Sequence, residues 1–239
     1  MSETGRAAAP GRVATVKRQL QDGAHAVLEP LVALLSQLGV RADHLTIAGL
    51  ALSGLSGLAF FEGHSRTGAL LLALAGVCDL LDGELARRTG AASRFGAFLD
   101  STLDRLSEAA VLLGILGFYL RNLLALVLHP ERALFQISTG LEPLTWAVVA
   151  FTVALALTGS FMVSYTRARA EGLGLDCKVG WFERPERVAL LILAGLLKVF
   201  WAMSAALLLL AVLSFATAAQ RVAHVHRNTR RAGMDQLGG

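Results

Sequence analysis

Apolar stretches close to twenty residues long recur along this 239-residue chain, and they constrain its fold more than any other feature. A helix needs about twenty apolar residues to cross a bilayer, and only helices and closed barrels satisfy their backbone polar groups inside one. The composition agrees, since 54% of the residues are hydrophobic and only 17% are charged. The sequence therefore predicts an all-α integral membrane protein.

The apolar stretches predict six transmembrane helices preceded by an amphipathic interfacial helix, in which basic and apolar positions are mixed. Asp43 stands where an N-cap of the first span is expected, and Pro185 suits the first turn of the fifth. The expected spans are about 43–61, 67–88, 93–120, 144–171, 185–197 and 202–227. The chain then divides into a disordered tail (1–11), an amphipathic juxtamembrane helix (12–42), a six-helix membrane domain (43–227) and a polar tail (228–239).

Four aspartates stand at helical spacing on the second and third predicted spans. Asp79 and Asp82 are one turn apart, as are Asp100 and Asp104, so each pair shares a helix face. The short connection would make the two helices antiparallel neighbours and bring four carboxylates into one small space. Such anions repel one another unless a divalent cation is bound, and oxygen ligands favour Mg²⁺, Mn²⁺ or Ca²⁺ over Zn²⁺. We therefore interpret the acids as a metal site rather than as salt-bridged acids at two solvated helix ends.

The same stretch reads D-x-x-D-G-x-x-A-R and, after eight residues, G-x-x-x-D-x-x-x-D. This pattern resembles the signature of the CDP-alcohol phosphotransferase family. Those integral membrane enzymes make phospholipids by moving a phosphatidyl or similar group from a CDP-linked donor to an alcohol, with release of CMP. All eight fixed positions are present: Asp79, Asp82, Gly83, Ala86, Arg87, Gly96, Asp100 and Asp104.

The resemblance implies a role for each position. The four aspartates would hold two Mg²⁺ (or Mn²⁺) ions, and Asp104 would also be the general base. The CDP-linked donor would lie against Asp43, Thr46, Asp79, Gly83, Ala86 and Arg87. Related enzymes often carry Pro before the Asn or Asp that lies near the cytidine, whereas this chain has Ala42 before Asp43. The resemblance also implies a homodimer.

A second group of strings bears on the acceptor. Residues 164–171 read S-Y-T-R-A-R-A-E and residues 183–187 read E-R-P-E-R. Both resemble prokaryotic phosphatidylinositol phosphate synthases, which join CDP-diacylglycerol and inositol 1-phosphate, and archaeal enzymes with an archaeol-based donor carry similar strings. Carried over by position, the acceptor-phosphate contacts would be Arg167, Arg187 and Arg221.

Several alternatives remain open at this point. Arginines near helix ends can be interfacial anchors rather than phosphate ligands. The acceptor could be glycerol 3-phosphate or serine instead of inositol 1-phosphate. In a different class of protein, a cation transporter could use intramembrane acids as an ion path.

Basic residues set the expected orientation. Connections on the side of the signature carry most of the Arg and Lys, while the opposite side has only Arg66, Arg121, Arg132 and Lys198. The positive-inside rule then predicts a multi-pass protein of the cell membrane whose signature faces the cytoplasm. Its expected partners are the CDP-lipid, the acceptor and membrane lipids, with no nucleic acid.

Overall fold

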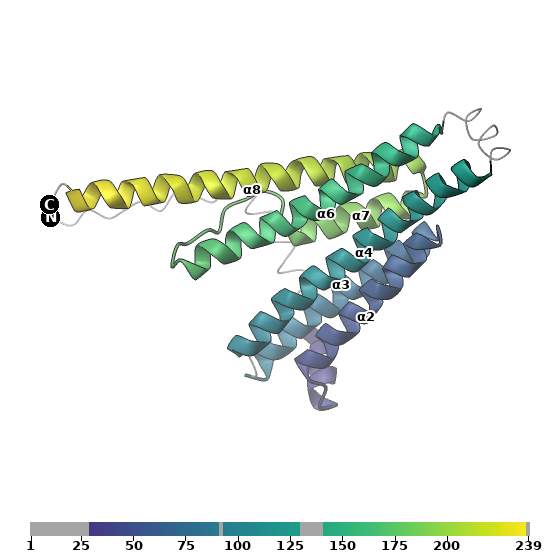
Figure 1. The fold of residues 1–239 in the computed structure, drawn as a ribbon. Helices are drawn as coiled ribbons and strands as arrows, with labels where there is room; N and C mark the ends of the chain where they lie inside the picture. The colour runs from purple at the N-terminus through teal and green to yellow at the C-terminus, as the bar shows by residue number, and fades with distance from the viewer. Residues whose placement is uncertain (1–28, 91–92, 130–140, 238–239) are drawn as a thin grey trace.

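The fold was analysed in a computed structural model, which describes residues 29–90, 93–129 and 141–237. Helices account for all of the regular structure in these ranges, so the predicted all-α class is confirmed. The expected disordered tail and most of the juxtamembrane helix lie outside the described residues. Residues 29–37 are helical, and the helices that follow are α2 (Ala42–Phe61), α3 (Ser65–Arg88), α4 (Arg94–Leu128), α6 (Pro143–Gly172), α7 (Arg184–Leu197) and α8 (Phe200–Leu237) (Figure 1).

Four of the described helices, α2, α4, α6 and α8, are long and apolar enough to cross a membrane. Helices α3 and α7 differ from these four in length or charge. Helix α7 has 14 residues, or about 21 Å, less than the roughly 30 Å of a bilayer core. Helix α3 has 24 residues but carries Asp79, Asp82 and Glu84 toward its C-terminal end.

Local signals account for where several helices begin. Ser93 is the N-cap of α4, and its Oγ accepts a hydrogen bond from the Gly96 N–H at 2.9 Å. Pro185 lies in the first turn of α7, as predicted, behind a capping box formed by Glu183 and Glu186. The N-cap assignment of Asp43 is wrong, because α2 begins at Ala42 with Arg41 in the capping position. Asp43 lies instead in the first turn, where its negative charge favours the positive end of the helix dipole.

Two helices extend beyond their predicted ends. Helix α4 continues past residue 120 to Leu128, and its polar side chains in this part have partners. The Arg121 Nη1 lies 2.9 Å from the Glu62 Oε2, and the Asn122 amide donates to the Phe118 carbonyl at 2.8 Å. Helix α8 continues to Leu237, so the predicted boundary at 227 falls inside a helix.

Helix α2 packs against both α3 and α4. The crossing with α4 requires glycine, because a Cβ on Gly57 would collide with the Ala110 carbonyl and one on Gly114 with the Gly57 carbonyl. Ser56 donates a buried hydrogen bond to the Gly68 carbonyl of α3 at 2.7 Å. In the described part of the chain, α2 rather than α3 is thus the main partner of α4, which differs from the expected direct α3–α4 pairing. The acids of α3 and α4 therefore face each other across a cleft whose third wall is α2.

The remaining helices complete the bundle and set its polarity. Helix α6 packs against α4 and α8, and α7 packs against α3 and α8. Tyr119, Trp146 and Phe200 form an aromatic cluster at one end, near the α7–α8 connection. The C-terminal end of α3, the start of α4, the C-terminal end of α6 and the far end of α8 lie at the opposite end (Figure 1). Both halves of the signature and the basic strings therefore share one end of the molecule.

Candidate active site

Three aspartates form a compact acid cluster at this end. Carboxylate oxygens of Asp79 and Asp82 on α3 and of Asp100 on α4 lie within 4.8 Å of one another. Asp82 is buried, and its Oδ2 accepts a hydrogen bond from the Thr46 hydroxyl of α2 at 2.8 Å, which fixes the carboxylate. An all-carboxylate donor set at this spacing fits a hard divalent cation that the three acids share.

Asp104 lies beside this cluster and is paired with an arginine. The Nη1 of Arg184, at the start of α7, is 2.8 Å from the Asp104 Oδ1 and 2.7 Å from the Asp79 Oδ2. The Nη1 of Arg105 lies further away, 3.9 Å from the Asp104 Oδ2. The structure therefore brings three of the four predicted metal ligands together and joins the fourth to them through Arg184.

Two of the six predicted donor residues, Thr46 and Asp79, line the cleft beside the acids. Asp82, Asp104 and Arg184 also line it. At Gly83 an added Cβ would meet only the Arg87 guanidinium within 4 Å, at 3.5 Å, so this face of α3 is open to a ligand. The Arg87 side chain is exposed and pairs with Glu84 at 2.7 Å. Asp43 and Ala86 are both half-buried, Asp43 in the first turn of α2 and Ala86 in the last turn of α3.

An apolar cavity of about 290 Å³ adjoins the acids. It opens beside Asp79 and Arg184 and runs between α3, α4 and α7. Its apolar walls are formed by Leu72, Val77, Leu80, Val111, Val188, Leu191 and Ile192. Polar groups at one end and hydrocarbon walls along the rest suit a ligand with a charged head and an apolar chain.

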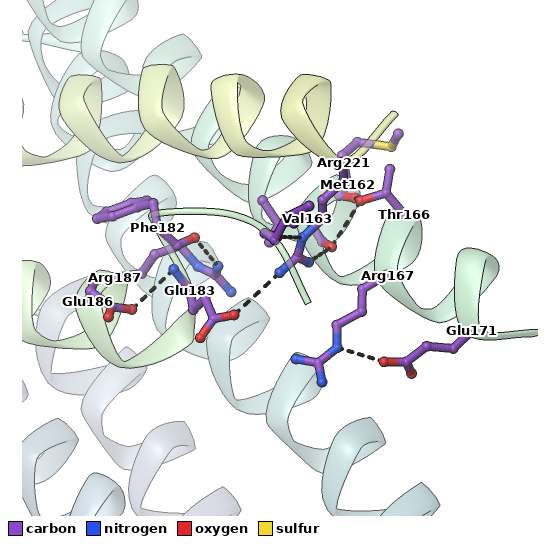
Figure 2. Close-up of polar contacts among 11 residues, drawn as sticks. Met162, Val163, Thr166, Arg167, Glu171, Phe182, Glu183, Glu186, Arg187 and Arg221 are labelled. Carbon is purple, nitrogen blue, oxygen red and sulfur yellow. Dashed lines mark hydrogen bonds and ion pairs between the residues drawn. The ribbon is translucent and has the colours of Figure 1, made fainter. Parts of the chain in front are cut away.

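The three predicted acceptor arginines come from α6, α7 and α8 and lie around Glu183 (Figure 2). Arg187 is only 2% exposed and forms a two-pronged ion pair with Glu108, at 2.6 Å and 2.9 Å. Arg221 is equally buried and donates to the Val179 carbonyl at 2.8 Å and the Val163 carbonyl at 2.5 Å. The Arg221 Nη2 also lies 3.6 Å from Glu183.

Arg167 differs from the other two arginines. Its side chain is 41% exposed and pairs with Glu171 one turn later on α6, at 2.9 Å. Of the three guanidiniums, that of Arg167 is therefore the most accessible to a ligand.

Three residues of this site were missed in the sequence. Glu108 follows Asp104 by four positions and so continues the helical face of Asp100 and Asp104, which was a usable signal. Glu183 and Arg184 stand inside the E-R-P-E-R string, but nothing in their spacing shows that one caps a helix and the other reaches two acids. The Arg184–Asp79 contact joins residues 105 positions apart and depends on how α7 packs.

Comparisons with known proteins agree with this geometry. Residues 40–219 match the model of the CDP-alcohol phosphatidyltransferase family. The chain is 38% identical over 192 residues to the archaetidylinositol phosphate synthase of Methanothermobacter thermautotrophicus, covering 79% of this chain and 85% of that protein. A solved structure of phosphatidylinositol phosphate synthase from Mycobacterium tuberculosis with CDP-DAG bound has a TM-score of 0.66 and 31% identity, covering 82% of this chain and 92% of that one.

A second solved structure of the Mycobacterium tuberculosis enzyme is in complex with manganese and citrate. It has a TM-score of 0.65 and 31% identity, and it covers 82% of this chain and 87% of that one. With the three clustered carboxylates of Asp79, Asp82 and Asp100, this identifies a divalent cation, Mg²⁺ or Mn²⁺, as the cofactor. The signature, the acid cluster and the match over residues 40–219 together show that this chain is a membrane enzyme of the CDP-alcohol phosphatidyltransferase family.

Proposed function

We propose that this enzyme transfers a phosphatidyl-type group from a CDP-linked lipid to inositol 1-phosphate and releases CMP. One observation carries the proposal: the apolar cavity opens beside Asp79 of the acid cluster, and Arg184, which pairs with Asp79, stands on the first turn of α7 together with Arg187, one of the three predicted acceptor arginines. A CDP-lipid needs the acid cluster and the cavity, for its diphosphate and its chains. An acceptor that already bears a phosphate needs the arginines, because guanidinium groups match phosphate geometry. The names of the relatives point to the same acceptor.

The residues divide the reaction between them. Asp79, Asp82 and Asp100 would hold the metal, with Asp104 as a further ligand, and Thr46 keeps Asp82 oriented. When bound, one or two divalent cations neutralise the donor diphosphate and the leaving CMP. The acceptor hydroxyl oxygen forms a bond to the lipid-bearing phosphorus, the phosphorus–oxygen bond to CMP breaks, and Asp104 takes the hydroxyl proton. The nucleotide would lie on the open face of α3, in contact with Gly83, Ala86 and Arg87, and would also contact Asp43 of α2.

The acceptor phosphate would be bound by Arg167, Arg187 and Arg221. Arg167 makes the first contact because its side chain is the exposed one. Arg187 and Arg221 are held by Glu108 and by two backbone carbonyls, so their guanidinium groups are fixed in place. Glu183, between them, would hydrogen-bond inositol hydroxyls.

A panel of acceptors tests this assignment. CMP release from one CDP-lipid is measured with inositol 1-phosphate, free inositol, glycerol 3-phosphate and serine. We expect inositol 1-phosphate to give the highest kcat/KM, and Arg167→Ala to raise its KM by about ten- to a hundredfold, with the donor KM little changed. Arg169→Ala, which removes an exposed neighbour on the same helix, is the matched control and should leave both KM values unchanged.

The other acceptors make different demands on the site. Glycerol 3-phosphate would also need the arginines, whereas serine has no phosphate for them to bind. A preference for glycerol 3-phosphate would contradict inositol 1-phosphate as the acceptor but keep the arginines as phosphate ligands. A preference for serine would contradict both assignments. Membership of an enzyme family removes the ion-transport alternative.

We further propose that α3 and α7 complete a six-span domain over residues 43–227. The juxtamembrane helix would lie in the membrane interface, and the acid cluster would face the cytoplasm in the cell membrane. The excess of basic residues at the signature end supports this orientation. We also propose a homodimer, which light scattering of the purified protein in detergent tests directly. A monomeric mass would contradict it.

Cysteine labelling tests the orientation. In a background where Cys78 and Cys177 are replaced by alanine, Thr89→Cys lies at the signature end and Lys198→Cys at the opposite end, both at exposed positions. An impermeant maleimide applied to intact cells should label Lys198→Cys and spare Thr89→Cys until the membrane is opened. The reverse pattern would invert the topology.

A further inference from the structure

Arg184 contacts acids on both helices of the active site. Its Nη1 lies 2.7 Å from the Asp79 Oδ2 of α3 and 2.8 Å from the Asp104 Oδ1 of α4. The backbone sets this position, because Arg184 is the first residue of α7, immediately before Pro185 and inside the capping box of Glu183 and Glu186. The fixed start of α7 therefore places the Arg184 guanidinium between two proposed metal ligands, Asp79 and Asp104.

A second observation indicates that Arg184 also has a ligand to bind. Its Nε is buried and, among the described residues, has no hydrogen-bond partner. Unpaired buried donors are unfavourable, and a phosphate oxygen would satisfy this one. Arg184 also lines both the acid cleft and the apolar cavity. The diphosphate of a CDP-lipid must lie at that junction if its nucleotide is on the open face of α3 and its chains are in the cavity.

We propose that Arg184 is a donor-binding residue that competes with the metal for Asp79 and Asp104 and turns to the donor's diphosphate once the metal is bound. This inference rests on the proposed function. A cation and a guanidinium repel each other and both need the Asp79 carboxylate, so binding of one weakens binding of the other. Metal binding and donor binding are thereby coupled through one side chain.

Metal affinity of the full-length enzyme in detergent provides the first measurement. Free Mn²⁺ is titrated by electron paramagnetic resonance in the absence of nucleotide and acceptor. Arg184→Gln removes the competing charge and should tighten Mn²⁺ binding by on the order of tenfold. Arg105→Gln is the matched control. The Arg105 guanidinium lies 3.9 Å from the same Asp104 but does not bridge two acids. We expect less than about a threefold change in that variant.

Affinity for CDP, the soluble head of the donor, provides the second measurement on the Mn²⁺-loaded enzyme. Arg184→Gln should weaken CDP binding by about ten- to a hundredfold, while Arg105→Gln should not. Tighter Mn²⁺ binding together with weaker CDP binding is expected if Arg184 acts on both ligands. A loss of packing would weaken the binding of both. Arg184→Lys keeps the charge but not the forked geometry, so it should bind Mn²⁺ like the wild type and CDP several-fold more weakly.

The Mn²⁺ and CDP affinities test the proposed role of Arg184 independently of which acceptor the enzyme uses. Mn²⁺ binding that is unchanged or weaker in Arg184→Gln, or CDP binding that is unchanged, would overturn the proposal. If Arg184→Gln does not elute as a folded species, Arg184→Lys still tests it through CDP affinity alone. A wild type that rejects inositol 1-phosphate would defeat the proposed acceptor and leave both of these measurements standing.

Discussion

Asp100→Asn is expected to lower turnover by at least about a hundredfold while leaving the protein folded. The Asp100 carboxylate lies within 4.8 Å of those of Asp79 and Asp82, so the substitution removes one of three charges available to a single cation. Asparagine has the same shape and relieves repulsion between neighbouring acids, which is why the fold should survive. Asp79→Asn should behave in the same way.

Activity and metal binding are measured together for these variants. CMP release reports turnover, and the increase in melting temperature on adding Mn²⁺ reports metal binding, since a ligand of the native state raises stability. Asp176→Asn, at an exposed acid in the loop between α6 and α7, is the control and should match the wild type in both. Near-normal turnover in both Asp79→Asn and Asp100→Asn would remove the metal assignment.

Glu108→Ala is expected to lower the free energy of unfolding by about 3–5 kcal/mol. The substitution leaves the guanidinium of Arg187, which is 2% exposed, without the carboxylate that binds it at 2.6 Å and 2.9 Å. Inside a membrane domain water cannot readily replace that partner. Reversible unfolding in mixed micelles measures the change.

Two further variants separate the ion pair from general effects of losing a glutamate. Glu171→Ala breaks an ion pair of similar length between exposed groups on α6 and should change stability by no more than about 1 kcal/mol. The double variant Glu108→Leu with Arg187→Leu removes both buried charges and should recover most of the stability lost in Glu108→Ala. A Glu108→Ala protein as stable as Glu171→Ala would mean that the buried pair does not stabilise the link between α4 and α7.

The buried pair also changes how Arg187 is best tested. From the sequence it resembled a phosphate ligand like Arg167. In the structure, two guanidinium nitrogens of Arg187 donate hydrogen bonds to the two carboxylate oxygens of Glu108. Substitution of Arg187 would therefore disturb stability and acceptor binding together, whereas substitution of Arg167 reports on the acceptor alone.

Local sequence signals predicted the helices well. Apolar runs and the proline at position 185 located the starts of α4 and α7 because each signal depends on a few adjacent residues. The end of α4 could not be predicted in this way. Arg121 suggests a helix end by itself, but in the structure it pairs with Glu62 and lies over the Phe61 ring while the helix continues.

The candidate site was predictable to the same degree. Asp79, Asp82 and Asp100 meet as their spacing indicates, because α3 fixes the first two and the start of α4 brings Asp100 to the same end of the molecule. The packing of both helices against α2 and the pairing of Asp104 with Arg184 were not predicted. The parts contributed by α7 were not predictable. Arg184 reaches Asp79 and Arg187 reaches Glu108 only because α7 packs between distant segments, against α3 and α8. No spacing rule within the sequence carries that information.

The central claim is that this chain makes a phosphorylated inositol lipid with release of CMP, using a divalent metal held by the acid cluster. Its most direct test is mass spectrometry of the products from purified enzyme, a CDP-lipid, inositol 1-phosphate and Mg²⁺. The account predicts one CMP for each lipid product, a product that retains the acceptor phosphate, and loss of both when EDTA is added. A product lacking that phosphate, or equal yields with and without EDTA, would contradict it.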